Sequence, residues 1–315
     1  MRKQLSLLVL ITLLLTLSSC ENGSQSKQPG TLNILSFNVY SGNSDHAEIS
    51  NADTADMRIE KRADKLNDLL LGENISIAGL QEVNSEWQNW LSTSLDSSYA
   101  YVGSCTEATH EGGYIVYNKE TFSLITDGAF WLAEGAPSTA EIGWDGKYDR
   151  LCSWALLRIK DTNNHILFMN THLDHKGTLA RKYSSKLILE QIDELLLHFE
   201  ETYHIRNCSV ILTGDMNSEP KTSVYRTFTE ILTDSFHVAK NNSVEEKAST
   251  SPGLYHRVSE ENYVKDGHRI DYIFVSNNSF EVLTYKMLHT ATNLCPYGEY
   301  LSDHNAIIAQ LTPIT

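Results

Sequence analysis

Short apolar segments recur along the whole chain, and several follow one another with no helical segment between them. Each is short enough for a strand buried on both faces and too short for a typical buried helix. Strands therefore outnumber helices, which favours mixed sheets over one parallel sheet with a helix after every strand. The segments are residues 32–37, 75–80, 114–117, 151–159, 166–169, 210–213, 270–275, 282–288 and 306–311.

Three other segments predict helices. In residues 59–70 the apolar side chains recur at helical spacing, and residues 183–199 repeat the pattern over a longer stretch. Residues 222–232 predict a third helix, whereas the polar stretch 239–253 predicts a surface loop. Because no repeat and no linker follows Gly30, we predict a single domain over residues 31–315, α/β (α+β) in class.

The N-terminus has the pattern of an export signal followed by a tether. Arg2 and Lys3 precede a mostly apolar stretch, residues 5–17, which is short for a membrane span. Leu17-Ser18-Ser19-Cys20 resembles a bacterial lipobox, in which the cysteine receives a lipid after cleavage. We therefore predict a lipoprotein signal peptide over residues 1–19, and a lipidated Cys20 with a flexible tether over residues 20–30. The alternative is an ordinary secretory signal with an incidental cysteine.

A lipid on Cys20 would tether the protein to a membrane of the bacterial cell envelope. The sequence does not choose between the periplasm and the cell surface. Export also permits disulfides. Four cysteines remain, and three pairings are possible; buried thiols or one optional bridge are favoured. They are Cys105, Cys152, Cys208 and Cys295.

The charge balance bears on the substrate. Without residues 1–19, the loss of Arg2 and Lys3 reduces Lys+Arg from 25 to 23 against 40 Asp+Glu, a formal charge of −17. A protein that binds long DNA usually has a basic face to neutralise phosphates. The acidic balance lowers the expectation of such a nuclease without excluding a local basic patch. It is compatible with a small phosphoester, or with a site where a metal supplies positive charge.

Polar residues stand at the ends of the predicted strands, where a rigid scaffold can bring them to one rim. Asn38 closes the first strand and could equally be a turn residue. Glu82 directly follows the second strand in Gly79-Leu80-Gln81-Glu82-Val83. Mg²⁺ prefers a few carboxylate oxygens and keeps several waters, so Glu82 is a candidate ligand.

Two further clusters follow strands in the middle of the chain. Asn170-Thr171-His172-Leu173-Asp174-His175 places two histidines and an aspartate within four residues. Thr213-Gly214-Asp215-Met216-Asn217 follows the next apolar strand, and the spacing of Asp215 and Asn217 points both side chains to one side of an extended chain. A carboxylate beside an amide can orient a water and a phosphoryl oxygen.

The last two clusters pair an aspartate with a histidine. Asp271 lies within the apolar segment 270–275, where an unpaired carboxylate would be costly, so it needs a partner. Asp303 and His304 precede the final strand. A histidine oriented by an aspartate is the usual arrangement for proton transfer near neutral pH.

Together, and in this order, these clusters resemble the endonuclease/exonuclease/phosphatase superfamily. The resemblance covers nearly all of residues 31–315. It implies a deoxyribonuclease I-like fold, a four-layer sandwich of two mixed β-sheets flanked by helices. It also implies an exported bacterial member acting as a monomer. The matching motifs are LSFN (35–38), GLQEV (79–83), NTHLDH (170–175), TGDMN (213–217), RIDYIF (269–274) and SDH (302–304).

The resemblance implies a Mg²⁺ site, with Mn²⁺ as an alternative. Asn38 and Glu82 would hold the ion, with Glu82 as the direct ligand, and Asp303 would support the site. Among the residues implied to bind substrate, Arg150 could bind phosphate, although a surface ion pair is an equal alternative. Asp174 and His256 complete that set. The alternative role of Asp174 is to orient its neighbours, and the equal alternative for His256 is a solvated loop histidine.

The resemblance also implies catalytic roles. His172 would donate a hydrogen bond to a phosphoryl oxygen. Asp215 and Asn217 would orient the nucleophilic water and the phosphate. Asp271 would hold His304 in its reactive tautomer, and His304 would act as the general base or as a transition-state stabiliser.

These residues predict a metal-dependent hydrolase of a phosphomonoester or phosphodiester. The substrate would be a small molecule, a lipid headgroup or a nucleic acid. The first alternative is an exported endonuclease or exonuclease acting on DNA or RNA, which a basic groove beside His304 would favour. The second is a surface binding protein without activity, which is disfavoured because every core catalytic position holds a competent residue.

Overall fold

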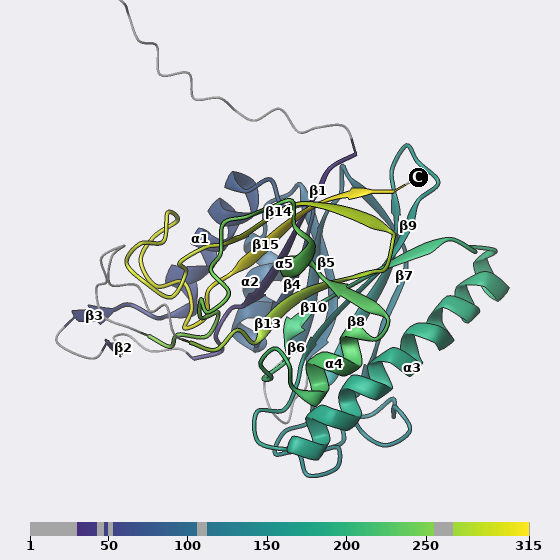
Figure 1. The fold of residues 1–315 in the computed structure, drawn as a ribbon. Helices are drawn as coiled ribbons and strands as arrows, with labels where there is room; N and C mark the ends of the chain where they lie inside the picture. The colour runs from purple at the N-terminus through teal and green to yellow at the C-terminus, as the bar shows by residue number, and fades with distance from the viewer. Residues whose placement is uncertain (1–29, 43–46, 50–52, 106–111, 255–266, 315) are drawn as a thin grey trace, which may run out of the picture.

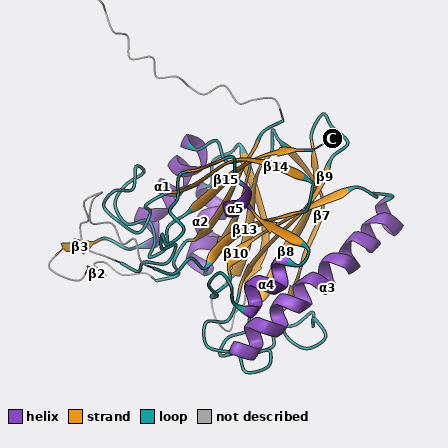
Figure 2. Ribbon diagram, viewed as in Figure 1, coloured by secondary structure: helices purple, strands orange, loops and turns teal. Residues whose placement is uncertain are grey.

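Two β-sheets face each other at the centre of the protein (Figures 1 and 2). The computed structural model describes residues 30–314, apart from 43–46, 50–52, 106–111 and 255–266. The first sheet has seven strands in the order β12-β14-β15-β1-β4-β6-β5, and the second has six in the order β11-β13-β10-β9-β8-β7. A short pair, β2 and β3, stands apart.

Nine of the described strands lie close to the predicted segments, whereas six were not predicted: β2, β3, β5, β7, β11 and β12. Those of the first sheet are β1 (Leu32–Asn38), β4 (Ile77–Gln81), β5 (Tyr99–Cys105), β6 (Gly112–Asn118), β12 (Asn241–Asn242), β14 (Phe280–Met287) and β15 (Ile307–Pro313). Those of the second are β7 (Phe122–Trp131), β8 (Leu151–Ile159), β9 (His165–His172), β10 (Cys208–Asp215), β11 (Leu232–Asp234) and β13 (Asp271–Ser276). The small pair is β2 (Ala47–Ile49) and β3 (Asp53–Ala55).

Both large sheets are mixed, as the sequence predicted. β1 runs parallel to β4 and antiparallel to β15. β10 runs parallel to β9 and antiparallel to β13. Parallel strands need a crossover, and α1 (Ile59–Gly72) joins β1 to β4 while α3 (Thr178–Tyr203) joins β9 to β10.

The helices and the two sheets form four layers, with an apolar core between each neighbouring pair of layers. This arrangement confirms the predicted sandwich. One layer packs α1 and α2 (Ser85–Ser94) against the first sheet. The second fills the space between the sheets. The third packs α3 and α4 (Ser223–Thr229) against the second sheet, and the long α3 crosses the lower right of Figure 1.

A buried polar network joins the two sheets near the ends of their central strands. Asn170 donates to the carbonyls of Leu80 and Tyr114, and its Oδ1 accepts from Gln81 at 2.6 Å and from Thr213 at 3.1 Å. A Cβ on Gly79 would lie 2.0 Å from the Thr213 hydroxyl oxygen, so only glycine allows this approach. The network fixes β4 against β9 and β10 directly beneath the polar clusters.

Besides the six strands that were not predicted, the structure differs from the sequence-based prediction in three places. α2 was not expected, although Asn84 caps it through two backbone N–H groups and Trp87, Trp90 and Leu91 bury one face. The predicted helix over 222–232 is shorter, because α4 ends at Thr229 and β11 begins at Leu232. The stretch 239–253 is not a plain surface loop, because it contains β12 and buries residues 248–250. The remaining helix is α5 (Ser235–Val238).

The signal-peptide prediction falls on residues 1–19, outside the described part of the chain, as do Cys20 and residues 20–29 of the tether. Among the helices that the structure describes, none is long and apolar enough to cross a membrane. Cys152, Cys208 and Cys295 are free thiols, and burial raises the pKa of Cys208 to about 12 and that of Cys295 to about 11.

Candidate active site

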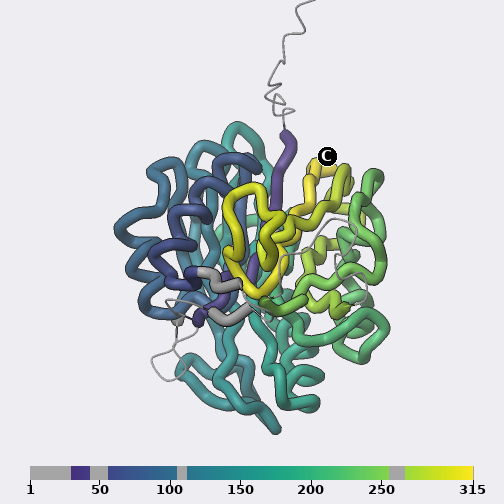
Figure 3. The backbone as a smooth tube through the Cα atoms, turned by 90° about the vertical axis from the view of Figure 1, so that its left-hand side faces the viewer, coloured from purple at the N-terminus to yellow at the C-terminus, as the bar shows by residue number. Residues whose placement is uncertain are grey.

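Strand register brings the polar clusters together at one rim of the sandwich. Asp215, the last residue of β10, pairs with His172 at the end of β9 and with Asp271 at the start of β13. In the facing sheet, Asn38 at the end of β1 pairs with Gln81 at the end of β4, next to Glu82. In Figure 3, the yellow C-terminal segment lies between the blue N-terminal half and the green part of the chain; it carries Asp303 and His304.

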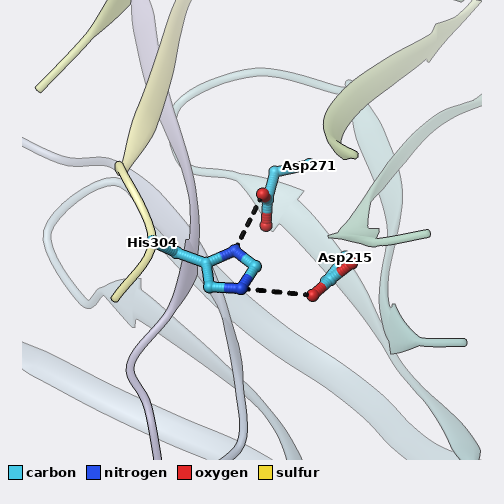
Figure 4. A group of neighbouring side chains, drawn as sticks. All are labelled: Asp215, Asp271 and His304. Carbon is cyan, nitrogen blue, oxygen red and sulfur yellow. Dashed lines mark hydrogen bonds and ion pairs between the residues drawn. The ribbon is translucent and has the colours of Figure 1, made fainter. Parts of the chain in front are cut away.

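His304 lies between two aspartates (Figure 4). Its Nδ1 is 3.0 Å from Asp271 Oδ2, and its Nε2 is 3.7 Å from Asp215 Oδ2. The Ser251 hydroxyl lies 3.2 Å from the same Nε2. Thr250 fixes the backbone of Asp271, since its hydroxyl accepts from the Ile270 and Asp271 N–H groups. Asp271 therefore has the histidine partner that its place in an apolar strand required.

The two aspartates change the protonation of this group. Burial alone would lower the pKa of His304, but the carboxylates of Asp271 and Asp215 outweigh burial and hold it well above the usual value. Burial, with the nearby carboxylate of Asp271, raises the pKa of Asp215 to about 7. Without a bound cation, a proton is therefore shared within this group near neutral pH.

Glu82 is fixed by donors on both of its oxygens. Asn38 Nδ2 donates to Oε1 at 2.9 Å, and the backbone and hydroxyl of Ser41 both donate to Oε2 at 3.0 Å. Burial raises the pKa of Glu82, but these hydrogen bonds outweigh burial and lower it below its usual value. Asn38 Nδ2 also donates to Asp215 Oδ2 at 3.2 Å, so it joins the two carboxylates. Glu82 is thus held as a charged carboxylate.

Asp303 lies beside Glu82 on the same side of the site. Burial raises the pKa of Asp303, and the charge of Glu82 raises it further. Both carboxylates, after burial, also raise the pKa of the Tyr40 phenol. Two half-buried carboxylates that repel one another form a site where a cation would be stabilised.

His172 and Asn217 form the other side of the site. Asn217 Nδ2 lies 3.0 Å from His172 Nε2, and Arg150 Nη1 lies 2.9 Å from His172 Nδ1. Burial, the Arg150 charge and His304 lower the pKa of His172 well below its usual value, so the ring is neutral. A guanidinium can only donate, so Nδ1 accepts from Arg150 and Nε2 carries the proton. Nε2–H and the Asn217 amide are then two donors side by side.

Asp174 stabilises the backbone of two loops near the site. Its carboxylate accepts hydrogen bonds from the backbone N–H groups of Lys147, Tyr148, Lys176 and Gly177. After the opposing effect of burial, these bonds lower its pKa. It therefore holds the loop before β8 against the start of α3, and substrate contact by Asp174 stays a prediction. His256 lies outside the described residues.

Arg62 was missed in the sequence, yet it ties the loops of the site together. It is completely buried in α1 and donates to five backbone carbonyls, those of Val39, Tyr40, Gly42, Met57 and Leu301. These bonds join the loop after Asn38 to the segment that precedes Asp303. Burial lowers the pKa of Arg62 to about 10, although nearby Asp303 opposes the decrease. Its position on the apolar face of a predicted helix could have identified Arg62 as a buried arginine.

Three of the eleven described non-glycine residues with positive φ lie at the same rim. Tyr40, Glu82 and Asn217 have φ values of 61°, 60° and 44°, in the left-handed region that non-glycine residues rarely adopt. Such conformations cost ~1–3 kcal/mol each and cluster at functional sites. Each turns the chain sharply after a strand, so that the side chains meet at the rim. Ser41 and Ser251 could not have been singled out from their sequence context.

The donor set is compatible with a metal ion. Side-chain ligand atoms of Asp215, Asp271 and His304 lie within 4.8 Å of one another. The Asp271 Oδ1 atom is buried, and no described residue forms a hydrogen bond with it. Glu82 and Asp303, on the adjacent side, add two more carboxylates. Oxygen-rich sets of this kind suit hard divalent cations.

Comparisons with known proteins agree with this geometry. Residues 35–304 match the Endonuclease/Exonuclease/phosphatase family. A family protein from Bacteroides thetaiotaomicron is 26% identical, with a TM-score of 0.72, over 90% of this chain and 98% of that chain. A mannosyl-6-phosphatase from the same species is 26% identical, with a TM-score of 0.71, over 89% and 99%.

A third structure, an endonuclease/exonuclease/phosphatase from Bacteroides vulgatus, has the same fold at 24% identity. Its TM-score is 0.72, over 90% of this chain and 99% of that chain. A search of curated protein sequences finds no significant match. On the strength of the family match and of the clusters that the fold assembles, this chain belongs to the endonuclease/exonuclease/phosphatase family of phosphoester hydrolases.

Proposed function

We propose that this protein is a Mg²⁺-dependent phosphoesterase that hydrolyses a phosphomonoester or phosphodiester by in-line attack of water. The proposal rests on one observation: Glu82, Asp215 and His304, far apart in the sequence, lie at one rim, where Asn38 donates to both Glu82 and Asp215 and His304 Nε2 lies 3.7 Å from Asp215. A cation on one side and donors on the other would neutralise the oxygens of a phosphoryl group between them.

Glu82 and Asp303 would hold the ion, and Asn38 would support the site by orienting Glu82, because its Nδ2 donates to Glu82 while its Oδ1 accepts from the Tyr40 N–H. Their oxygens suit Mg²⁺, and Mn²⁺ could replace it. The mutual repulsion of Glu82 and Asp303 supports this assignment, because a bound cation would remove it. When bound, the ion supplies Lewis-acid stabilisation of phosphoryl oxygens.

On the donor side, His172 and Asn217 would bind the phosphoryl oxygens. The His172 Nε2–H and the Asn217 amide, whose nitrogens lie 3.0 Å apart, can both donate to one anionic oxygen. Arg150 fixes the tautomer of His172 and adds positive charge behind it. Donors that are already in place stabilise developing charge without reorganisation, and each is typically worth ~10²-fold or more in rate.

His304 and Asp215 would handle the nucleophilic water. Asp271 orients His304, whose Nε2 points toward Asp215. Asp215, with its raised pKa, is suited to accept the proton of an attacking water. A protonated His304 would then stabilise the charge that develops at phosphorus.

A second function, hydrolysis of nucleic acid, has one supporting observation. A groove of about 670 Å³ opens beside Asn217 and Ser251, and its wall includes Arg181 and Lys221. Such a groove could hold the continuation of a DNA or RNA strand. Glu219 in the same wall and the acidic balance of the chain oppose it, so we favour a small substrate. Cleavage that falls steeply with added salt would support the nuclease.

We also propose that the protein is exported and tethered by a lipid on Cys20. The support is the signal-like N-terminus with Cys20 at the end of its apolar stretch. A Cys20→Ser variant should appear in the soluble envelope fraction and lose palmitate labelling, while the wild type stays in the membrane fraction. Equal membrane association of both proteins would contradict the lipid anchor.

The activity is tested with a phosphoester panel. It contains p-nitrophenyl phosphate, bis-p-nitrophenyl phosphate, sphingomyelin, phosphoinositides, plasmid DNA and RNA. We expect hydrolysis of at least one small ester with Mg²⁺, none with EDTA, and none by a His304→Ala variant assayed at a temperature where that variant is folded. Activity that survives both EDTA and His304→Ala would overturn the proposed function.

A further inference from the structure

The proposed tether and the active site lie at opposite ends of β1. The tether leads into Leu32, the first residue of β1, whereas Asn38, the last residue, lies at the rim. A strand rises ~3.3 Å per residue, so the seven residues of β1 separate these ends by roughly 20 Å. In Figure 1 the chain enters β1 near the top, close to the C-terminus, and the β2–β3 pair that follows the other end of β1 lies at the far left. The start of β1 is thus the end of the sandwich that is nearest to the proposed anchor.

A groove with an apolar lining opens beside the start of β1. Leu32 pairs with Leu311, so the end of β15 extends past the start of β1. The start of β14 lies next to that end, because Phe280 pairs with Pro313. The groove has a volume of about 570 Å³, and we call it the tether-end groove. Its apolar lining consists of Val238, Phe280, Val282, Pro313 and Ile314.

Two apolar side chains of the tether-end groove are open to solvent. Ile314 is 55% exposed and Val238 is 47% exposed. Lys240 and Glu281 also line the groove, and they form an ion pair, so their charges cancel. Exposed apolar side chains without an opposing charge are suited to contact with another apolar surface, such as a lipid bilayer.

Exposed apolar side chains are concentrated at this end of the sandwich. Among the described residues, nine large apolar side chains are exposed. Six of them stand at the ends of their elements that are opposite to the rim: Leu71 on α1, Leu197 and Tyr203 on α3, Ile231 before β11, and Val238 and Ile314 in the groove. The other three lie near the start of α3, on the side of the rim: Ile142, Leu179 and Tyr183.

The length of the tether favours contact through the same end. Ten residues, 20–29, precede Gly30. A Gly/Ser-rich linker of ten residues has an r.m.s. length of roughly 16–19 Å and a maximum of roughly 33–36 Å. With the tether-end groove on the bilayer, almost none of this reach is needed. With the rim on the bilayer, the tether would have to extend along the whole sandwich, which costs conformational entropy.

We infer that the tether-end groove rests on the lipid bilayer that holds the lipid on Cys20, so that the rim faces away from this bilayer and acts on water-soluble phosphoesters. The inference rests on the proposed phosphoesterase function and on the proposed lipid anchor. Headgroups of the same bilayer would lie on the far side of the sandwich from His304, whereas solutes would reach the rim freely.

Photocrosslinking of the lipidated full-length chain tests the orientation. The protein is inserted into phosphatidylcholine vesicles, with Val238, Ile314 or Leu179 replaced singly by the photocrosslinker p-benzoylphenylalanine. We expect crosslinks to phospholipid from positions 238 and 314, and at least several-fold fewer from position 179, which lies on the side of the rim. Equal or stronger lipid crosslinking at position 179 would overturn the inference. Crosslinks from positions 238 and 314 to a second copy of the chain, or to residues 20–29, would overturn it as well.

Two double variants test whether the groove itself makes the contact. The photocrosslinker is now placed at Leu71, which lies at the same end but outside the groove. Lipid crosslinking from this position should fall in Val238→Ser/Ile314→Ser, because the apolar contact is lost. It should stay unchanged in Ile142→Ser/Leu179→Ser, the matched control, which removes two exposed apolar side chains on the side of the rim. Equal crosslinking in the two double variants would contradict docking through the groove.

Hydrolysis tests the direction of the rim. For p-nitrophenyl phosphate and bis-p-nitrophenyl phosphate, kcat/KM of the anchored protein should equal that of the lipid-free Cys20→Ser protein, because the rim stays open to water. A several-fold loss on anchoring would overturn the inference. Faster hydrolysis of sphingomyelin or phosphoinositides in its own vesicles by the anchored protein than by Cys20→Ser would also overturn it.

Failure of the two underlying proposals has different signatures. If the phosphoesterase function fails, the anchored protein and Cys20→Ser are both inactive, while the crosslinks still report the orientation. If the lipid anchor fails, the wild type carries no lipid and stays outside the vesicles, and this inference falls with it.

Discussion

Asp271 Oδ2 lies 3.0 Å from His304 Nδ1, and both side chains are almost completely buried. The bond connects the first residue of β13 to the segment before β15, so it joins the two sheets at the rim. It fixes the ring with Nε2 toward Asp215, and it stabilises the protonated ring.

Replacing this aspartate should therefore change the protonation of His304. In Asp271→Asn the amide keeps the shape but loses the charge, and we expect the pKa of His304 to fall. NMR titration of the ring follows that pKa directly. We expect kcat to fall ~10²–10⁴-fold, as is typical when a histidine loses its orienting aspartate. An unchanged ring pKa in Asp271→Asn would contradict the electrostatic account of His304.

Divalent metal should bind through Glu82. EDTA should abolish hydrolysis, and added Mg²⁺ should restore it. In Glu82→Gln we expect the Mg²⁺ concentration for half-maximal rate to rise ~10-fold or more, because a charged ligand becomes neutral. The control is Glu201→Gln, which changes an exposed carboxylate at the end of α3. Identical Mg²⁺ titrations for the wild type and Glu82→Gln would remove Glu82 from the metal site.

The sequence predicted nine of the fifteen described strands, because strands that are buried on both faces leave a simple pattern of apolar residues. Strand ends were predicted less accurately: Asn38, His172 and Asp215 are the last residues of their strands, whereas the predicted segments end at residues 37, 169 and 213. The fold then brings these ends together through strand register, which local sequence does not encode. The absence of helices between several predicted strands was enough to predict mixed sheets. It was not enough to predict the order of the strands within each sheet.

Contacts that depend on loop geometry could not be predicted. Ser41 donates twice to Glu82, and Ser251 contacts His304, yet both are ordinary polar residues in polar stretches. Asp174 was given a role in substrate binding because it stands within a motif. In the structure its carboxylate instead accepts hydrogen bonds from four backbone N–H groups. α2 was missed because its buried face has only three residues, Trp87, Trp90 and Leu91.

The raised pKa of Asp215 predicts an unusual pH dependence of stability. Folding raises this pKa from 3.8 to about 7, so the folded state binds a proton that the unfolded state releases. The stability from this group is complete below pH ~4 and is lost as the pH rises toward 7. The raised pKa of His304 has the same sign, and its contribution is lost only at higher pH.

In EDTA at pH 8, Asp215→Asn should therefore be more stable than the wild type, by ~1–3 kcal/mol. The variant should also have no hydrolytic activity. Urea unfolding at pH 5 and pH 8 measures the effect, and the gain should be smaller at pH 5. Saturating Mg²⁺ should stabilise the wild type at pH 8 more than the variant. A destabilised Asp215→Asn at pH 8 would show that its hydrogen bonds outweigh charge repulsion.

Arg62 should affect metal binding although it is not placed as a ligand. In Arg62→Lys three donors replace five, so at least two of the buried carbonyls lose their partner, at ~1–3 kcal/mol each. The loops that carry Ser41 and Asp303 would then be less well fixed. We expect a lower midpoint of thermal unfolding and a several-fold rise in the Mg²⁺ concentration for half-maximal rate.

At saturating Mg²⁺ and a temperature where Arg62→Lys is folded, KM for substrate should stay close to the wild-type value, because Arg62 lies on the carboxylate side and not beside His172 and Asn217. Arg158→Lys, an exposed position on β8, is the matched control and should change none of these quantities. If KM changed while the Mg²⁺ titration stayed the same, Arg62 would affect substrate binding. That result would contradict its proposed role in supporting the metal site.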